Sequence, residues 1–175
     1  MSAPAASYSS ELASAMRMLA DDPRVVFVGQ GVRYNSHRMF GSLEGIPMER
    51  RIEMPVAEDF QMGFCTGLAL EGMVPVALYP RWDFLLLAAN QLVNHLDKLY
   101  RFGWHPKVII RVAVGATAPM NPGPQHTQDH TRAFRKMLQS VKAHRLTAAE
   151  SVFPAYRHAL NSRHSSIMVE YMEHY

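Results

Sequence analysis

Hydrophobic positions along this chain follow two alternating patterns. Short, largely apolar runs, typical of strands buried on both faces, occupy residues 25–28, 52–56, 74–79, 107–114 and 166–171, and the more polar residues 141–146 are interpreted as a further strand. Segments with apolar residues three and four positions apart, typical of helices, occupy residues 10–20, 58–71, 84–102, 129–138 and 149–161. The residues between 33 and 50, and those from 115 to 128, show no clear period and are interpreted as loops.

This alternation predicts an α/β fold with three layers, in which a mostly parallel sheet carries helices on both faces. We expect one domain over residues 10–175, preceded by a short disordered tail over residues 1–9. In such sheets ligands bind beyond the carboxyl ends of the strands. Glu58, residues 80–83, the 115–128 loop and residues 147–150 each follow a predicted strand, so we expect them to share one edge of the sheet.

Composition narrows the function classes. The 175 residues suit one domain, and a net charge of +3 with scattered basic residues gives little support to nucleic-acid binding. No apolar run is long enough to span a bilayer, and the first residues lack the pattern of a secretory signal. The single cysteine, Cys65, excludes an internal disulfide and suits a reducing compartment. We therefore expect a cytoplasmic protein that acts on neither nucleic acid nor membrane.

Glu58 is the first candidate for chemistry. A partly desolvated carboxylate where a strand ends and a helix begins can exchange a proton near neutrality. The alternative is that Glu58 and its neighbour Asp59 only stabilise the helix N-terminus through the helix dipole. Spacing alone favours this second interpretation.

Aromatic and histidine side chains provide the other candidates. Trp82 and Phe84 lie in a predicted turn, where they could stack on a flat heterocycle; alternatively, Phe84 is core and Trp82 is a lid. Asp83 between them is the expected helix cap. His126 lies in a rigid loop and could move a proton. His126 and His130 could ligate a metal if both were helical, but a third ligand is not evident, so a metal site is not favoured.

Several motifs are missing from the sequence. It has no G-x-G-x-x-G, no phosphate-binding G-x-x-x-x-G-K-[ST] and no G-x-S-x-G. It also has no Gly-Asp-Gly followed at a distance by Asn, a pattern that binds magnesium and a diphosphate group.

The block from residue 51 to residue 98 is the most distinctive part of the chain. PVAEDFQMGFCTGLALEGMVPV combines a Pro-x-x-Glu motif with a glycine-spaced helix, DFLLLAANQLVNHLDK follows it, and GPQHTQ comes later. These segments resemble the thiamine-diphosphate pyrimidine-binding domain of 2-oxo acid dehydrogenase beta subunits and of transketolase-like enzymes. The resemblance extends from about Ser10 to Tyr171.

The resemblance implies roles for four residues. Glu58 takes the place of the glutamate that hydrogen-bonds the aminopyrimidine ring nitrogen N1′ and helps to activate the cofactor. Trp82 and Phe84 take the place of aromatic residues near the pyrimidine, and His126 that of an active-site histidine. The implied cofactor is thiamine diphosphate, with Mg²⁺ bound mainly by an alpha-type partner subunit.

The sequence departs from the family at three places. Asp59-Phe60-Gln61 follow the glutamate where small or apolar residues are usual, Pro119 and Pro122 replace loop glycines, and the resemblance ends before the family's C-terminal domain. We expect a stand-alone beta-type subunit of a split enzyme, inactive without its alpha-type partner. It would act on a 2-oxo acid by decarboxylation or by acyl or ketol transfer.

The expected assembly is a dimer or heterotetramer. Gly63 and Gly67 lie on one face of their predicted helix, where the lack of side chains allows another helix to come close. Together with the helix predicted over residues 84–102, this face would form the interface. The alternative function is that of a non-catalytic paralogue with a structural or regulatory role in a partner complex.

Overall fold

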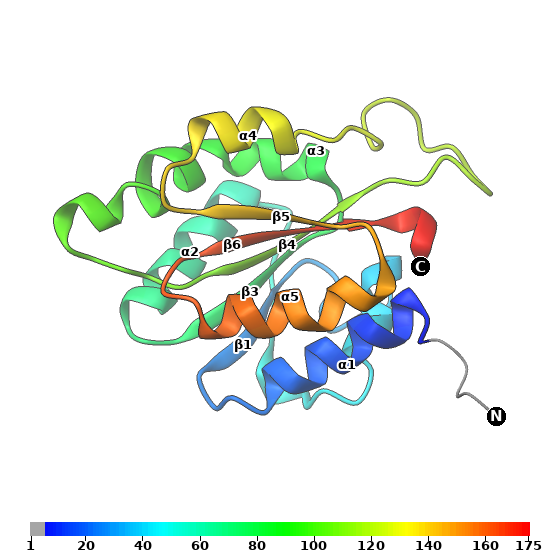
Figure 1. The fold of residues 1–175 in the computed structure, drawn as a ribbon, viewed down its shortest axis with the longest axis horizontal. Coiled ribbons are helices and arrows are strands. Elements are labelled where there is room, and N and C mark those ends of the chain that lie inside the picture. The colour runs from blue at the N-terminus through cyan, green and yellow to red at the C-terminus, as the bar shows by residue number, and fades with distance from the viewer. Residues whose placement is uncertain (1–5) are drawn as a thin grey trace.

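The computed structural model describes residues 6–175, which form a single six-stranded sheet (Figure 1). The strands are β1 (Val25–Gly29), β2 (Arg51–Glu53), β3 (Val74–Tyr79), β4 (Ile109–Val114), β5 (Lys142–Leu146) and β6 (Ser166–Tyr171). They lie in the order β2-β1-β3-β4-β6-β5, and every neighbouring pair is parallel. The predicted parallel α/β fold is confirmed.

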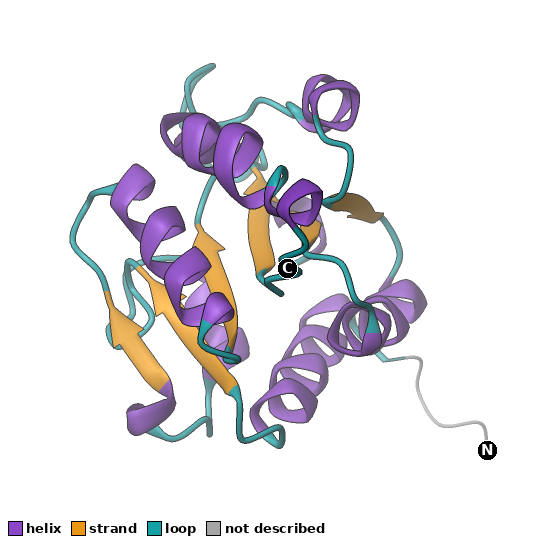
Figure 2. Ribbon diagram, turned by 90° about the vertical axis from the view of Figure 1, so that its left-hand side faces the viewer, coloured by secondary structure: helices purple, strands orange, loops and turns teal. Residues whose placement is uncertain are grey.

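Helices cover both faces of this sheet (Figure 2). One face packs against α1 (Tyr8–Ala20) and α5 (Ala149–Asn161), and the other against α2 (Glu58–Leu70), α3 (Trp82–Leu85) and α4 (Thr131–Met137). The strands separate two hydrophobic cores because alternate side chains point to opposite faces. In β3, Val76 and Leu78 join the core under α1 and α5, whereas Ala77 and Tyr79 join the other.

Several predicted boundaries shift by a few residues. The first helix begins at Tyr8 rather than Ser10, because the Ser7 side chain accepts the Ser10 N–H at 3.1 Å and caps the helix. Of the tail predicted over residues 1–9, residues 1–5 lie outside the described residues. Strand β2 ends at Glu53 instead of residue 56, and β4 begins at Ile109 instead of residue 107. The loop predicted from residue 33 to residue 50 contains two short 3-10 helices, Arg38–Leu43 and Met48–Arg50.

The prediction of one regular helix over residues 84–102 is wrong. The segment starts as α3, without the expected Asp83 cap, and continues as the 3-10 turn Leu86–Ala88, the π-helix Gln91–Leu96 and the 3-10 turn Leu99–Phe102. At the end of the π-helix the Asp97 N–H donates to Leu92 O at 2.9 Å, five residues back. The Asp97 side chain is fully buried and accepts hydrogen bonds from the backbone of residues 139–141. Side-chain periodicity carries no information about such a distant partner.

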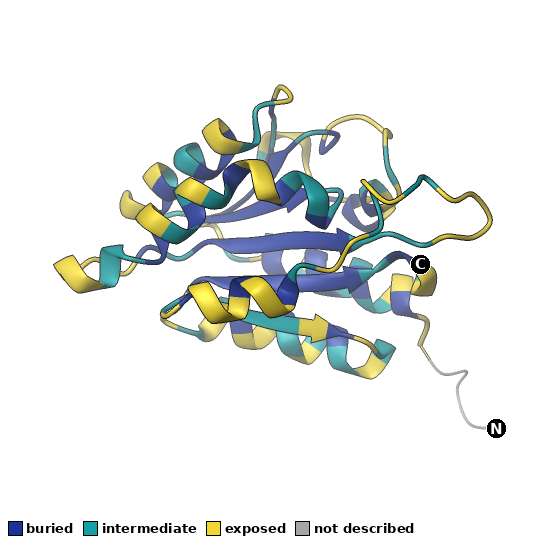
Figure 3. Ribbon diagram, turned by 90° about the horizontal axis from the view of Figure 1, so that it is seen from above, coloured by how far each residue is buried: buried dark blue, intermediate teal, exposed yellow. Residues whose placement is uncertain are grey.

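The central strands form a buried layer, the edge strand β5 is partly exposed, and the loop after β4 extends beyond the sheet as a largely exposed segment (Figure 3). This loop joins β4 to α4 at the carboxyl ends of the strands, the edge at which the sequence placed the candidate site. Within residues 6–175, no helix is both long and apolar enough to cross a membrane.

Candidate active site

Buried polar atoms without a partner concentrate at the carboxyl ends of the strands. Across residues 6–175, eight side chains carry a buried nitrogen or oxygen that makes no hydrogen bond. Five of them follow β1, β3 or β4, and these are His37, Arg81, Asp83, His126 and His130. Since buried polar groups are normally paired, this concentration makes the carboxyl ends of the strands the candidate site.

Glu58 is the first residue of α2, and its side chain is half-buried. The backbone fixes its position, because the Tyr79 hydroxyl at the end of β3 donates to Glu58 O at 3.2 Å. Within the described part of the chain, the Glu58 carboxylate makes neither a hydrogen bond nor an ion pair, so it is free to bind a ligand. Asp59, next to it, is exposed and accepts only a long hydrogen bond, 3.5 Å, from Gln91.

His126 and Phe84 come together although 42 residues separate them in the sequence. Their ring centroids are 5.5 Å apart at an interplanar angle of 86°, an edge-to-face contact that holds the imidazole in place. The Nδ1 atom of His126 is buried without a partner. Gly115 makes this approach possible, because a Cβ atom there would lie 2.2 Å from the His126 carbonyl oxygen.

Trp82 is part of the core. Its side chain is 0% exposed, its Nε1 donates to Thr131 Oγ1 at 3.1 Å, and its ring packs 4.8 Å from that of Phe134. In this structure Trp82 therefore offers no face for stacking on a ligand, and it is no lid. Phe84 is the half-buried aromatic of the pair. The alternative considered from the sequence, with Phe84 in the core and Trp82 as a lid, is therefore reversed.

The histidine pair considered as a metal site does not have the required geometry. Helix α4 begins at Thr131, so His126 and His130 do not share a helix. His130 Nε2 instead lies 3.8 Å from Asp83 Oδ1, which also accepts a 2.7 Å hydrogen bond from Gln128. No cluster of three or more metal-ligating side chains occurs in the region that the structure describes. Asp83 thus ties the 115–128 loop to α3, a role that the sequence did not indicate.

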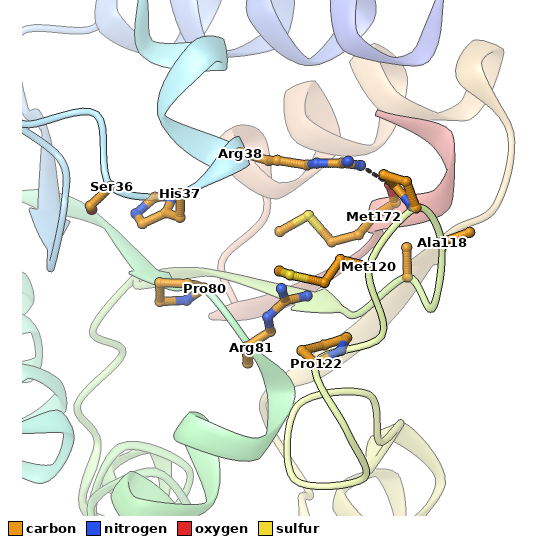
Figure 4. Close-up of a pocket in the computed structure, with 11 residues that line it drawn as sticks. Ser36, His37, Arg38, Pro80, Arg81, Ala118, Met120, Pro122 and Met172 are labelled. Carbon is orange, nitrogen blue, oxygen red and sulfur yellow. Dashed lines mark hydrogen bonds between the residues drawn. The ribbon is translucent and has the colours of Figure 1, made fainter.

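A cavity of about 350 Å³ opens beside these residues (Figure 4). Its walls come from the segments after β1, β3, β4 and β6, and the lining side chains include His37, Arg38, Arg81, Met120 and Met172. Sequence reasoning singled out the 80–83 turn for its aromatic residues and overlooked Arg81. Its position directly after a strand was the available signal.

Comparisons with known proteins place this arrangement in a family. The family model "Transketolase, pyrimidine binding domain" matches residues 5–174. The chain therefore belongs to the transketolase pyrimidine-binding domain family. A solved structure, "Split gene transketolase, inactive beta4 tetramer", superposes with a TM-score of 0.74 over 94% of this chain and 51% of that chain, at 18% identity, and supports the fold.

Relatives among curated proteins are subunits of pyruvate dehydrogenase. The chain is 27% identical over 142 residues to "Pyruvate dehydrogenase E1 component subunit beta" of Chaetosphaeridium globosum, covering 75% of this chain and 40% of that protein. It is 26% identical over 157 residues to the protein of the same name from Staurastrum punctulatum, covering 86% and 47%. The chain thus spans less than half the length of the curated relatives it matches.

Proposed function

We propose that this protein is the pyrimidine-binding, beta-type subunit of a split thiamine-diphosphate enzyme that acts on a 2-oxo acid. The observation that carries the proposal is the unpaired Glu58 carboxylate, held at the start of α2 in a chain that matches the pyrimidine-binding family over residues 5–174. Decarboxylation and acyl or ketol transfer are the candidate reactions. The proposed partner is an alpha-type subunit that bears the diphosphate-binding domain.

The described residues fit one half of the cofactor. A free carboxylate at Glu58 and an unpaired imidazole nitrogen at His126 are groups that suit an aminopyrimidine and a reacting carbonyl. The residues from 6 to 175 contain no cluster of three or more His, Cys, Asp or Glu side chains that could hold a metal ion. We therefore assign the diphosphate and Mg²⁺ mainly to the partner subunit.

When bound, thiamine diphosphate supplies a carbon nucleophile for the carbonyl group of the 2-oxo acid. Glu58 hydrogen-bonds N1′ of the aminopyrimidine and holds the proton at that nitrogen. His126, oriented by the edge of Phe84, holds or delivers a proton at the substrate oxygen. Trp82 acts as a positioning residue through its packing on Phe134 and its hydrogen bond to Thr131.

An exposed apolar surface on α2 and the following segment supports assembly. Phe60 and Leu87 are 60% and 63% exposed, and nothing lies within 4 Å of a Cβ atom placed at Gly67. Gly63 faces Gln91 of the same chain, 3.6 Å from such a Cβ atom, so its close approach is internal. Gly67 and its exposed neighbours form the surface we assign to a second subunit.

Glu58→Gln in the reconstituted complex tests the proposed role. The amide keeps the size of the side chain but cannot relay the proton, so turnover of the 2-oxo acid should fall by roughly 30-fold to 1000-fold. Asp59→Asn is the matched control and should retain most activity. Full activity in Glu58→Gln would contradict the proposal.

Calorimetry on the chain alone tests the split arrangement. Without a diphosphate site, the isolated chain should bind thiamine diphosphate weakly or not measurably, with or without Mg²⁺. Tight, magnesium-dependent binding by the isolated chain would show that no partner is needed for the cofactor.

A further inference from the structure

The cavity beside His126 has an unusual charge distribution. Eleven residues line it, and they include two arginines but no aspartate or glutamate. The side chains of Arg38, at the start of a 3-10 helix, and Arg81, just after β3, extend toward the part of the cavity bounded by Met120 and Met172 (Figure 4). The cavity therefore holds two guanidinium groups with no acidic group in its lining.

Arg81 has the greater need for a partner. Its NH1 atom is buried and makes no hydrogen bond within residues 6–175, whereas Arg38 NH1 donates to Met172 O at 3.4 Å. Burial lowers the pKa of the Arg81 guanidinium, the nearby Asp83 carboxylate opposes this effect, and Arg38 adds to it by repulsion. Asp83 makes no ion pair with Arg81 within residues 6–175; its Oδ1 accepts a hydrogen bond from Gln128, and its Oδ2 is unpaired.

Guanidinium groups recognise carboxylates and phosphates, whose oxygens match their planar array of N–H donors. An anion bound in the cavity that both arginines line would satisfy the unpaired NH1 atom and offset the repulsion. The rest of the lining is mainly apolar, formed by prolines, alanines and the two methionines, so it suits a short carbon skeleton.

We propose that this cavity, the Arg81 pocket, binds the phosphate or carboxylate group of a small molecule through Arg81 and Arg38. The pocket adjoins the proposed active site at Gly115, where an added Cβ atom would lie 2.7 Å from Arg81 NH1 and 2.2 Å from the His126 carbonyl oxygen. The identity of the bound group rests on the proposed function: it is a second anionic group of the substrate, remote from the reacting carbonyl.

Calorimetric titration of the full chain, without thiamine diphosphate or partner, tests the anion site by itself. Inorganic phosphate and succinate are the probes, at an ionic strength held constant with sodium chloride. We expect saturable binding of at least one probe below about 10 mM. The probe that binds more tightly identifies phosphate or carboxylate as the preferred group.

Three variants decide the outcome. Arg81→Gln should weaken binding roughly 10-fold or more through the loss of charge-assisted hydrogen bonds. Arg33→Gln removes the same charge from an exposed residue outside the pocket and should bind as the wild type does. Glu58→Gln should also bind the anion as the wild type does. The test of the anion site is therefore independent of the proposed catalytic role of Glu58, and a failure of one proposal can be told from a failure of the other.

The proposal is overturned if neither anion binds saturably, or if Arg33→Gln weakens binding as much as Arg81→Gln does. It is also overturned if Arg81→Gln affects only assembly with the partner, since the pocket would then receive a carboxylate side chain of that protein. Circular dichroism checks the folding of each variant. If Arg81→Gln does not fold, Arg38→Gln should still reduce affinity at least threefold, and an unchanged affinity counts against the site.

Discussion

The two ends of the sheet differ in whether their buried polar groups have hydrogen-bond partners. At the amino end they are paired: Ser165 Oγ accepts the Val108 N–H at 2.9 Å and donates to Pro106 O at 2.9 Å. Asp97 is fully buried, and its carboxylate accepts three backbone N–H groups, from residues 139, 140 and 141, in addition to an ion pair with Lys98.

At the carboxyl end several polar groups lack partners. The Glu58 carboxylate, Arg81 NH1 and His126 Nδ1 make no hydrogen bonds within residues 6–175. A fold gains stability from paired groups, whereas groups kept ready for a ligand contribute nothing or cost stability until it binds. The comparison teaches that paired groups at one end of the sheet hold the fold together, whereas the other end presents the unpaired groups to which we assign ligand binding.

Asp97→Asn should produce the largest loss of stability. The amide has one acceptor oxygen instead of two, and at the Oδ2 position its NH₂ group would face the Gln139 N–H and the Lys98 ammonium. We expect the free energy of unfolding to fall by about 3 kcal/mol, as for the disruption of a buried charged group. Urea denaturation measures it, with the exposed Asp59→Asn as control. A loss below about 1 kcal/mol would remove the contrast between the two ends.

The stability of the wild-type chain in acid should depend on the same side chain. Burial alone would raise the pKa of Asp97, but hydrogen bonds from Val141, Lys98, Ser140 and Gln139 lower it overall. A lowered folded-state pKa means that the stabilisation is complete at neutral pH. It is lost as the pH falls below the ordinary aspartate value of about 4 toward the lowered folded value. Unfolding free energies measured from pH 7 to pH 3 should fall more steeply for the wild type than for Asp97→Asn; parallel curves would refute this.

Arg81→Gln should have a smaller effect of the opposite sign. Without an anion, the wild-type pocket holds a partly buried guanidinium with an unpaired NH1, and the substitution removes this cost. We expect a gain of about 0.5–1 kcal/mol, seen as a rise of roughly 1–4 °C in Tm. Arg33→Gln should stay within about 0.5 kcal/mol of the wild type. A clear loss of stability in Arg81→Gln would assign the arginine to the fold.

Glu58→Gln should have the smallest effect on stability. Because its carboxylate makes no hydrogen bond or ion pair in the described chain, the unfolding free energy should change by less than about 0.5 kcal/mol, or rise slightly. Thermal denaturation without cofactor is the measurement. Marked destabilisation would favour a purely structural role at the N-terminus of α2.

Local patterns in the sequence were sufficient to predict most of the helices and strands. Strands β3 and β6 and helix α5 have the bounds expected from hydrophobic spacing, and α2 differs by a single residue. These elements are predictable because burial on both faces of a strand, or on one face of a helix, leaves a periodic record within a few residues. The parallel sheet and the shared edge at the strand ends follow from their alternation.

The amino-acid sequence by itself therefore determined the order of the elements, the fold class and the edge that carries Glu58 and His126. Only the tertiary structure decided which polar groups meet. Asp97 finds its partners 42 to 44 residues away, and the buried Arg111 pairs with Glu170, 59 residues away, at 2.8 Å. Trp82 is core and Arg81 faces a cavity because of segments that follow other strands. Periodicity reflects only near neighbours in the chain, whereas hydrogen bonds, ion pairs and cavities join residues that the folded sheet brings together.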